Sequence, residues 1–166
     1  MINRCRLLPI AAAAGLSLAS TSFGQGTTDY DALRTADQAK AMLAKAVAAV
    51  KADKANALDM FNKGEGGFRD GNLTVACFNV SDGKFVATGN PNSKKYLGID
   101  GRTFKDAHGS SLRLDEVAKK PEGEITIVDV ELPKPGPDQR PVPKQNYATK
   151  VGDLICSVGY FYWYNR

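Results

Sequence analysis

The stretch LTVACFNVSDGKFVAT, residues 73–88, decides the fold that this sequence predicts. Its two apolar runs are rich in β-branched and aromatic residues, and Ser81, Asp82 and Gly83 separate them. An Asp-Gly pair between two such runs is a strong signal for a β-hairpin. We therefore expect strands at 73–80 and 84–88, which begin an antiparallel sheet.

The sequence after the hairpin predicts three more strands and one short helix. Five of the eight prolines lie in 133–143, which indicates a loop or a wide hairpin. Residues 89–102 are rich in Gly, Asn, Pro and Lys and are typical of an irregular loop. A helix at 111–120 is expected to end before Pro121. The remaining strands are expected at 124–132, 144–150 and 154–163.

A long amphipathic helix is expected before the hairpin. Thr35 and Gln38 fit a capping box at its start, and Gly64 suits its C-terminal end. The apolar residues at helical spacing between these points are Met42, Leu43, Ala46, Val47, Val50, Ala57, Leu58 and Phe61. About 27 residues at 1.5 Å each make a rod of about 40 Å, which must lie along the sheet. The expected fold class is therefore α+β.

Residues 1–24 have the pattern of a secretory signal peptide. Arg4 and Arg6 precede the apolar run 7–19, and small residues follow it. This run is shorter than the roughly 18 to 20 residues that a helix needs to cross a bilayer. We therefore expect a cleaved signal, a polar lead-in at 25–34, and a single domain at 35–166. The mature protein is expected in the periplasm or outside the cell, with no transmembrane anchor.

Charge and composition exclude several classes of function. The formal net charge of +4 falls to +2 when Arg4 and Arg6 leave with the signal peptide. That is too little for a nucleic-acid binder, which needs a clustered basic face. One histidine and three cysteines leave little for a metal site, and no cofactor or catalytic motif is present.

Cys77 and Cys156 are the two cysteines that remain after signal removal. Two thiols in an oxidising compartment favour a disulfide, provided that their strands are neighbours in a suitable register. The alternative is that both are small, buried apolar residues. The sequence leaves both possibilities open.

The order of these elements, together with several short motifs, resembles the single Cache family of extracytoplasmic sensor domains. The resemblance covers about residues 35–163 and implies a PAS-like antiparallel sheet of five or six strands. It also implies a long N-terminal helix on one face and a small-ligand pocket on the other. Members often bind short carboxylates or similar metabolites. The matching pieces are AVKADKA (49–55), FN (61–62), GGFRD (66–70), CFN (77–79), DGK (82–84), LG (97–98), FKD (104–106), PKxxY (143–147) and KxGD (150–153).

Lys144 and Tyr147 are the first candidates for ligand binding, because the resemblance places this Lys-x-x-Tyr at the ligand cleft. An ammonium and a phenol suit a carboxylate through charge-assisted hydrogen bonds. Residues three apart on a strand point to opposite faces, so both reach one pocket only if a bend or bulge re-aims Lys144. The alternative is a solvated lysine and a half-buried core tyrosine.

Four further residues are weaker candidates. Arg69 suits an anion through two parallel hydrogen bonds, although it can equally pair with Asp70. Thr88 and Asn90 end the second strand at the expected mouth of the pocket, where turn formation explains them equally well. Phe78 is the expected apolar wall.

We therefore expect an exported, non-enzymatic protein that binds a small organic anion. Nothing follows Arg166, so it resembles a stand-alone Cache protein that presents its ligand to a membrane receptor or another envelope partner. The alternative is an envelope interaction module, in which the fold is a scaffold and the aromatic residues 160–164 dock a partner. Asp129 and Glu131 share a strand face, as a hydrolase pair would, but alternation with apolar neighbours explains them as a solvated face.

Overall fold

The computed structural model describes residues 34–106, 108–133 and 140–162. The predicted signal peptide, the lead-in before residue 34 and the aromatic residues 163 and 164 lie outside these ranges. Within the described ranges, no helix is both long enough and apolar enough to cross a membrane.

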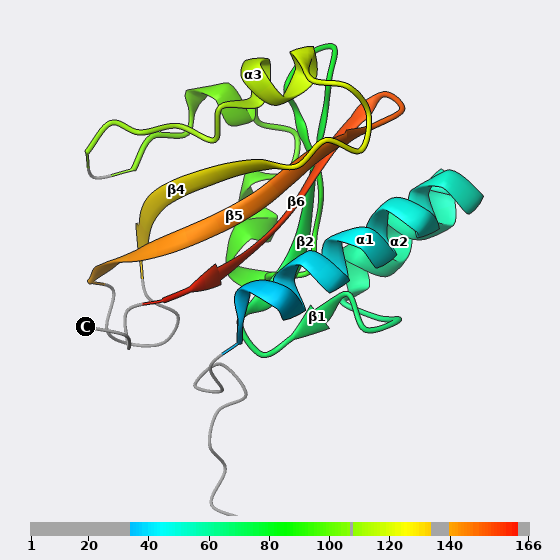
Figure 1. Cartoon of the computed structure of the whole chain (residues 1–166), viewed down its shortest axis with the longest axis horizontal. Coiled ribbons are helices and arrows are strands. Elements are labelled where there is room, and N and C mark those ends of the chain that lie inside the picture. The colour runs from blue at the N-terminus through cyan, green and yellow to red at the C-terminus, as the bar shows by residue number, and fades with distance from the viewer. Residues whose placement is uncertain (1–33, 107, 134–139, 163–166) are drawn as a thin grey trace, which may run out of the picture.

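Six antiparallel strands form one sheet within the described residues, and helices lie on both of its faces (Figure 1). The order is β1-β2-β6-β5-β4, and β3 pairs with the same edge of β2 as β1 does. The predicted α+β class and antiparallel sheet are confirmed. The strands are β1 (Arg69–Asp70), β2 (Leu73–Asn79), β3 (Phe85–Thr88), β4 (Thr126–Pro133), β5 (Pro141–Val151) and β6 (Leu154–Phe161).

The β2–β3 hairpin forms where the Asp-Gly pair predicts it. Gly83 has a φ of +69°, a left-handed conformation that glycine adopts without steric cost. The carboxylate of Asp82 accepts a hydrogen bond from the Lys84 amide at 3.1 Å, which closes the turn. A bulge between Cys77 and Phe78 then shifts the register of the pair. The sequence therefore placed both strands to within one residue.

The N-terminal helix lies on the sheet as expected, but it is interrupted. Two helices, α1 (Ala36–Ala52) and α2 (Lys54–Lys63), replace the single 40 Å rod that the periodicity predicted. Asp53 between them is extended, with a φ of −158°, and its carboxylate accepts a hydrogen bond from the Asn56 amide at 3.1 Å. An aspartate that caps a new helix competes with continuation of the old one. The break lets α1 pack on β5 and β6 while α2 packs on β3.

Two hydrophobic clusters cover the two faces of the sheet. We call the face under α1 and α2 the α1 face, and the opposite one, under α3 (Leu114–Lys119), the α3 face. The chain before α3 was expected to be irregular at 89–102, and it contains two short 3₁₀ helices, η2 (Pro91–Tyr96) and η3 (Gly101–Thr103). The buried residues of the α3-face cluster are Phe78, Phe85, Leu114, Val117, Ala148 and Ile155.

A disulfide joins Cys77 of β2 to Cys156 of β6 within the α1-face core. The two residues lie directly opposite each other in the β2–β6 register, with their Cα atoms 4.1 Å apart. This is close to the separation of a non-hydrogen-bonded antiparallel pair, in which side chains approach most closely. Of the two possibilities that the sequence left open, the structure has the disulfide.

Candidate functional site

Strand register assigns Lys144 to the α3 face. Residues directly opposite each other in an antiparallel pair point to the same side of the sheet. Lys144 lies opposite Phe161, and two residues further along Asn146 lies opposite Gly159. The next pair on this face is Ala148, which belongs to the α3-face core, and Ser157. Lys144 and Asn146 therefore project on the same side as α3.

Tyr147 lies on the other face, so the expectation that it meets Lys144 at one pocket is wrong. The register between β5 and β6 runs without a shift from Lys144 to Val151, so no bulge lies between Lys144 and Tyr147 to bring them to one face. Tyr147 is only 3% exposed and belongs to the core under α1, where the Lys40 ammonium lies 5.2 Å from its ring centroid. Its hydroxyl donates to Gln145 at 2.7 Å, and burial raises its pKa.

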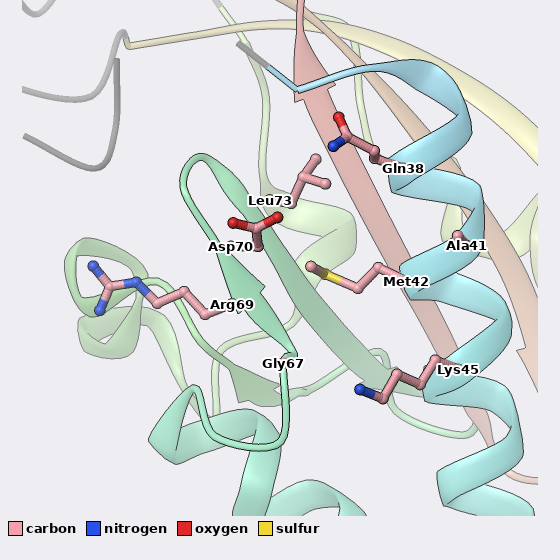
Figure 2. Close-up of a pocket in the computed structure, with 8 residues that line it drawn as sticks. All are labelled: Gln38, Ala41, Met42, Lys45, Gly67, Arg69, Asp70 and Leu73. Atoms are coloured by element: carbon pink, nitrogen blue, oxygen red, sulfur yellow. The ribbon is translucent and has the colours of Figure 1, made fainter. Parts of the chain in front are cut away.

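Arg69 and Thr88 lie on the α3 face together with Lys144. Arg69 pairs with Thr74, and Thr88 pairs with Ala76, which packs against the α3-face core. Figure 2 shows the Arg69 side chain pointing away from α1. The Thr88 hydroxyl accepts a hydrogen bond from the Asn90 amide at 3.1 Å.

The other two candidates have structural roles. The Asn90 side chain caps η2 by accepting a hydrogen bond from the Asn92 amide at 3.0 Å, which is the turn chemistry that the sequence also allowed. Phe78 lies on the α3 face, but it stacks on Phe85 with ring centroids 4.6 Å apart. Phe78 therefore fills the apolar half of the α3 face, beneath α3.

The environment of Lys144 sets it apart from the surface lysines. The residue is half-buried, its stem lies over Gly159, and its ammonium is 5.0 Å from the ring centroid of Phe161. Among the described residues, no carboxylate forms an ion pair with it. Burial lowers its pKa from 10.5 to about 8. A partly desolvated ammonium without a counter-ion can bind an anion strongly, because its charge is weakly screened.

Polar and small residues beside Lys144 complete this part of the face, and sequence reasoning missed them. They are Thr74, Asn146, Ser157 and Gly159. Asn146 is buried, and its amide nitrogen donates to the Val128 carbonyl at 3.3 Å. Strand alternation could have found two of them. Thr74 lies four residues before Phe78, and Asn146 lies between Lys144 and Ala148, so each shares a face with those residues.

A separate groove of about 520 Å³ lies between α1 and β1 (Figure 2). Its charged groups are engaged with the protein itself. The Lys45 ammonium donates to the Gly66 carbonyl at 2.7 Å, and the Asp70 carboxylate forms an ion pair with Arg34. The groove is lined by Gln38, Ala41, Met42, Lys45, Gly67, Arg69, Asp70 and Leu73.

The residues considered for the two alternative functions are also engaged. Asp129 is exposed and accepts a hydrogen bond from Gln145 at 3.0 Å, whereas Glu131 contacts His108 at 3.0 Å. Of the aromatic residues proposed to dock a partner, Tyr160 packs against the α1-face core and Phe161 is only 5% exposed.

Three solved structures that this chain is similar to come from chemotaxis or chemosensory proteins. A methyl-accepting chemotaxis protein from Vibrio parahaemolyticus matches with a TM-score of 0.58 at 17% identity, over 75% of this chain and 86% of that one. A Cache chemosensory domain, described with the structural basis of its carboxylic acid recognition, matches with a TM-score of 0.52 at 22% identity. The match covers 75% of this chain and 86% of that one. A periplasmic sensor domain of a chemotaxis protein matches with a TM-score of 0.53 at 20% identity, over 75% of this chain and 88% of that one.

These similarities confirm the fold that the motifs implied. The chain has a Cache-type fold, the fold of chemotaxis sensor domains. No protein-family model matches the sequence, and no curated protein does either.

Proposed function

We propose that this protein is an exported, non-enzymatic sensor domain that binds a short organic acid on the α3 face. The observation that carries the proposal is the half-buried Lys144 ammonium, which has a lowered pKa and no carboxylate partner among the described residues. An anionic ligand would supply the missing charge. A solved domain of the same fold is described as recognising carboxylic acids, which supports the same class of ligand.

The residues of the face would divide the ligand between them. Lys144 would hold the carboxylate through a charge-assisted hydrogen bond, and the long side chain of Arg69, on the same face, would be a further polar contact. Thr88 is buried in β3, level with Ala148 and three strands away from β5, so a short acid held at Lys144 does not reach it. Phe78 lies opposite Ile155, six residues along β6 from the partner of Lys144, so at about 3.3 Å per residue it is too far away to touch a short acid held there. Tyr147 and Asn90 have no part in this site.

The size of the ligand limits its affinity. The best small ligands gain at most about 1.5 kcal/mol of binding free energy per heavy atom. An acid with four heavy atoms therefore binds with a dissociation constant no lower than ~40 µM. Such an affinity suits sensing better than scavenging. We propose a membrane receptor or another envelope protein as the partner that responds to the bound state, in the periplasm or outside the cell.

A calorimetric titration with unbranched acids of two to four carbons tests the proposal. Lys144→Met should weaken the binding of any acid that the wild type binds by at least about tenfold, because it removes a hydrogen bond to a charged group. Lys150→Met is the matched control, since Lys150 is half-buried on the same strand and the same face, opposite Ile155. Equal affinity in the wild type and Lys144→Met would reject this site.

A further inference from the structure

We propose that Gly159 is a positioning residue, which lets the Lys144 side chain lie against β6 on the α3 face with Asn146 beside it. This inference rests on the proposed function. Gly159 lies in β6 opposite Asn146, and Lys144 is its diagonal neighbour. A Cβ at position 159 would lie 2.7 Å from Lys144 Cε and 2.7 Å from Asn146 Cγ. Any side chain at 159 would therefore displace both.

Backbone conformation does not account for this glycine. Gly83 and Gly152 have positive φ angles, which explain why glycine occupies those turns, but Gly159 is not among the residues with positive φ. A glycine inside a strand weakens it and often marks a place where another group approaches the backbone closely. At position 159 the groups that approach are the Lys144 stem and the Asn146 amide.

The missing side chain determines where the ammonium lies. With Gly159 in place, the Lys144 stem crosses β6, and its ammonium lies 5.0 Å from the centroid of the buried Phe161 ring. The hydrogen bond from Asn146 to the Val128 carbonyl holds the neighbouring amide in place. A methyl group at 159 would push the lysine off the sheet and into water, where it becomes an ordinary surface lysine.

The charged groups around this face do not otherwise hold the ammonium. Arg69 of β1 and Lys150 of β5 share the face with Lys144, and both are cations. The carboxylates of residues 100–116, before and within α3, are engaged elsewhere. Asp100 and Asp115 pair with Arg102, and Glu116 pairs with Arg113. Asp106 accepts hydrogen bonds from the backbone amides of His108, Ser110 and Glu131. Within the described residues, the position of the Lys144 ammonium therefore depends on packing and not on an ion pair.

Gly159→Ala tests the inference with two independent measurements. An NMR titration of the Lys144 side chain should show its pKa rising from about 8 in the wild type toward the ordinary value near 10.5. A calorimetric titration with propionate at pH 7 should show affinity at least about tenfold weaker, because the cation has left the site. Ser157→Ala, on the same strand and face, is the control and should leave both values unchanged.

Each outcome bears on a separate claim. An unchanged Lys144 pKa in Gly159→Ala would overturn the positioning role, whatever the affinity does. If the wild type binds no short acid, the proposed function fails, and the Lys144 titration alone still decides this inference. If Gly159→Ala does not fold, the same titration is made on Gly159→Ala combined with Asn146→Ala, which removes the nearer of the two obstructing side chains and should again raise the pKa.

Discussion

Lys144 lies against the Phe161 ring and Gly159, and no carboxylate among the described residues forms an ion pair with it. Desolvation disfavours the charged form of an amine, and this lowers the pKa of Lys144 to about 8. The protonated form is the one that binds an anion. The affinity for a short acid should therefore depend on pH in a range where exposed lysines remain charged.

Binding of a short acid should weaken as the pH rises through 8. Below pH 7 Lys144 is fully protonated and the affinity is constant, whereas above pH 8 it falls about tenfold per pH unit. Between pH 6.5 and 9.5 the dissociation constant should rise about 30-fold, as measured by calorimetry at each pH. Lys144→Arg keeps its charge, so any binding that it retains should not change over this range. A constant affinity in the wild type would show that Lys144 does not hold the ligand.

Four of the six residues that the sequence analysis grouped at one site share a face of the sheet. Lys144, Arg69, Thr88 and Phe78 were expected at the site, and all four lie on the α3 face. Tyr147 was assigned by resemblance against the alternation of its own strand, and alternation was correct. Gly159 could not be found from the sequence, because its role depends on a diagonal neighbour in another strand.

Among the elements, the disulfide between β2 and β6 links two interior strands of the sheet. It joins residues 79 positions apart, so it removes much of the loop entropy of the unfolded chain. The Cys77→Ala, Cys156→Ala double variant should lose about 4 kcal/mol of unfolding free energy, as measured by urea denaturation. Reductant should lower the urea midpoint of the wild type and leave that of the double variant unchanged. Equal midpoints for the wild type and the double variant would contradict a stabilising disulfide.

The start of α2 depends on one side chain. Asp53→Ala removes the carboxylate that accepts the Asn56 amide, and the unfolding free energy should fall by about 1 kcal/mol in urea. Asp59→Ala is the control, because it removes another exposed carboxylate of α2, which forms an ion pair with Lys63. That pair lies four residues apart on a helix and contributes about 0.5 kcal/mol or less. If both variants lose the same stability, Asp53 does not act as a cap.

Local signals predicted the elements that have local causes. The capping box of Thr35 and Gln38 starts α1, and Gly64 ends α2 with a φ of +71°. The break at Asp53 was missed because the apolar periodicity continues across it, through Val50 and Ala57. Hydrophobic spacing reports which side faces the sheet, and it does not report where the helix axis changes direction.

At the scale of the whole molecule, the sheet separates a structural face from a candidate binding face. The α1 face carries the disulfide, both long helices and Tyr147. The α3 face is apolar under α3, and polar around Lys144, Asn146 and Thr74. The sequence predicted both layers, but it could not assign side chains to them, because that requires the register between strands distant in the sequence. β1 was also missed, since two residues carry no periodicity.

An amide NMR titration of the protein with propionate at pH 7 tests ligand binding at the α3 face most directly. We predict that the largest shifts fall on Lys144, Asn146 and Gly159, in β5 and β6, and that Lys144→Met abolishes them. Shifts that fall instead on Ala41 and Lys45 of α1, along the groove of Figure 2, would contradict binding at the α3 face.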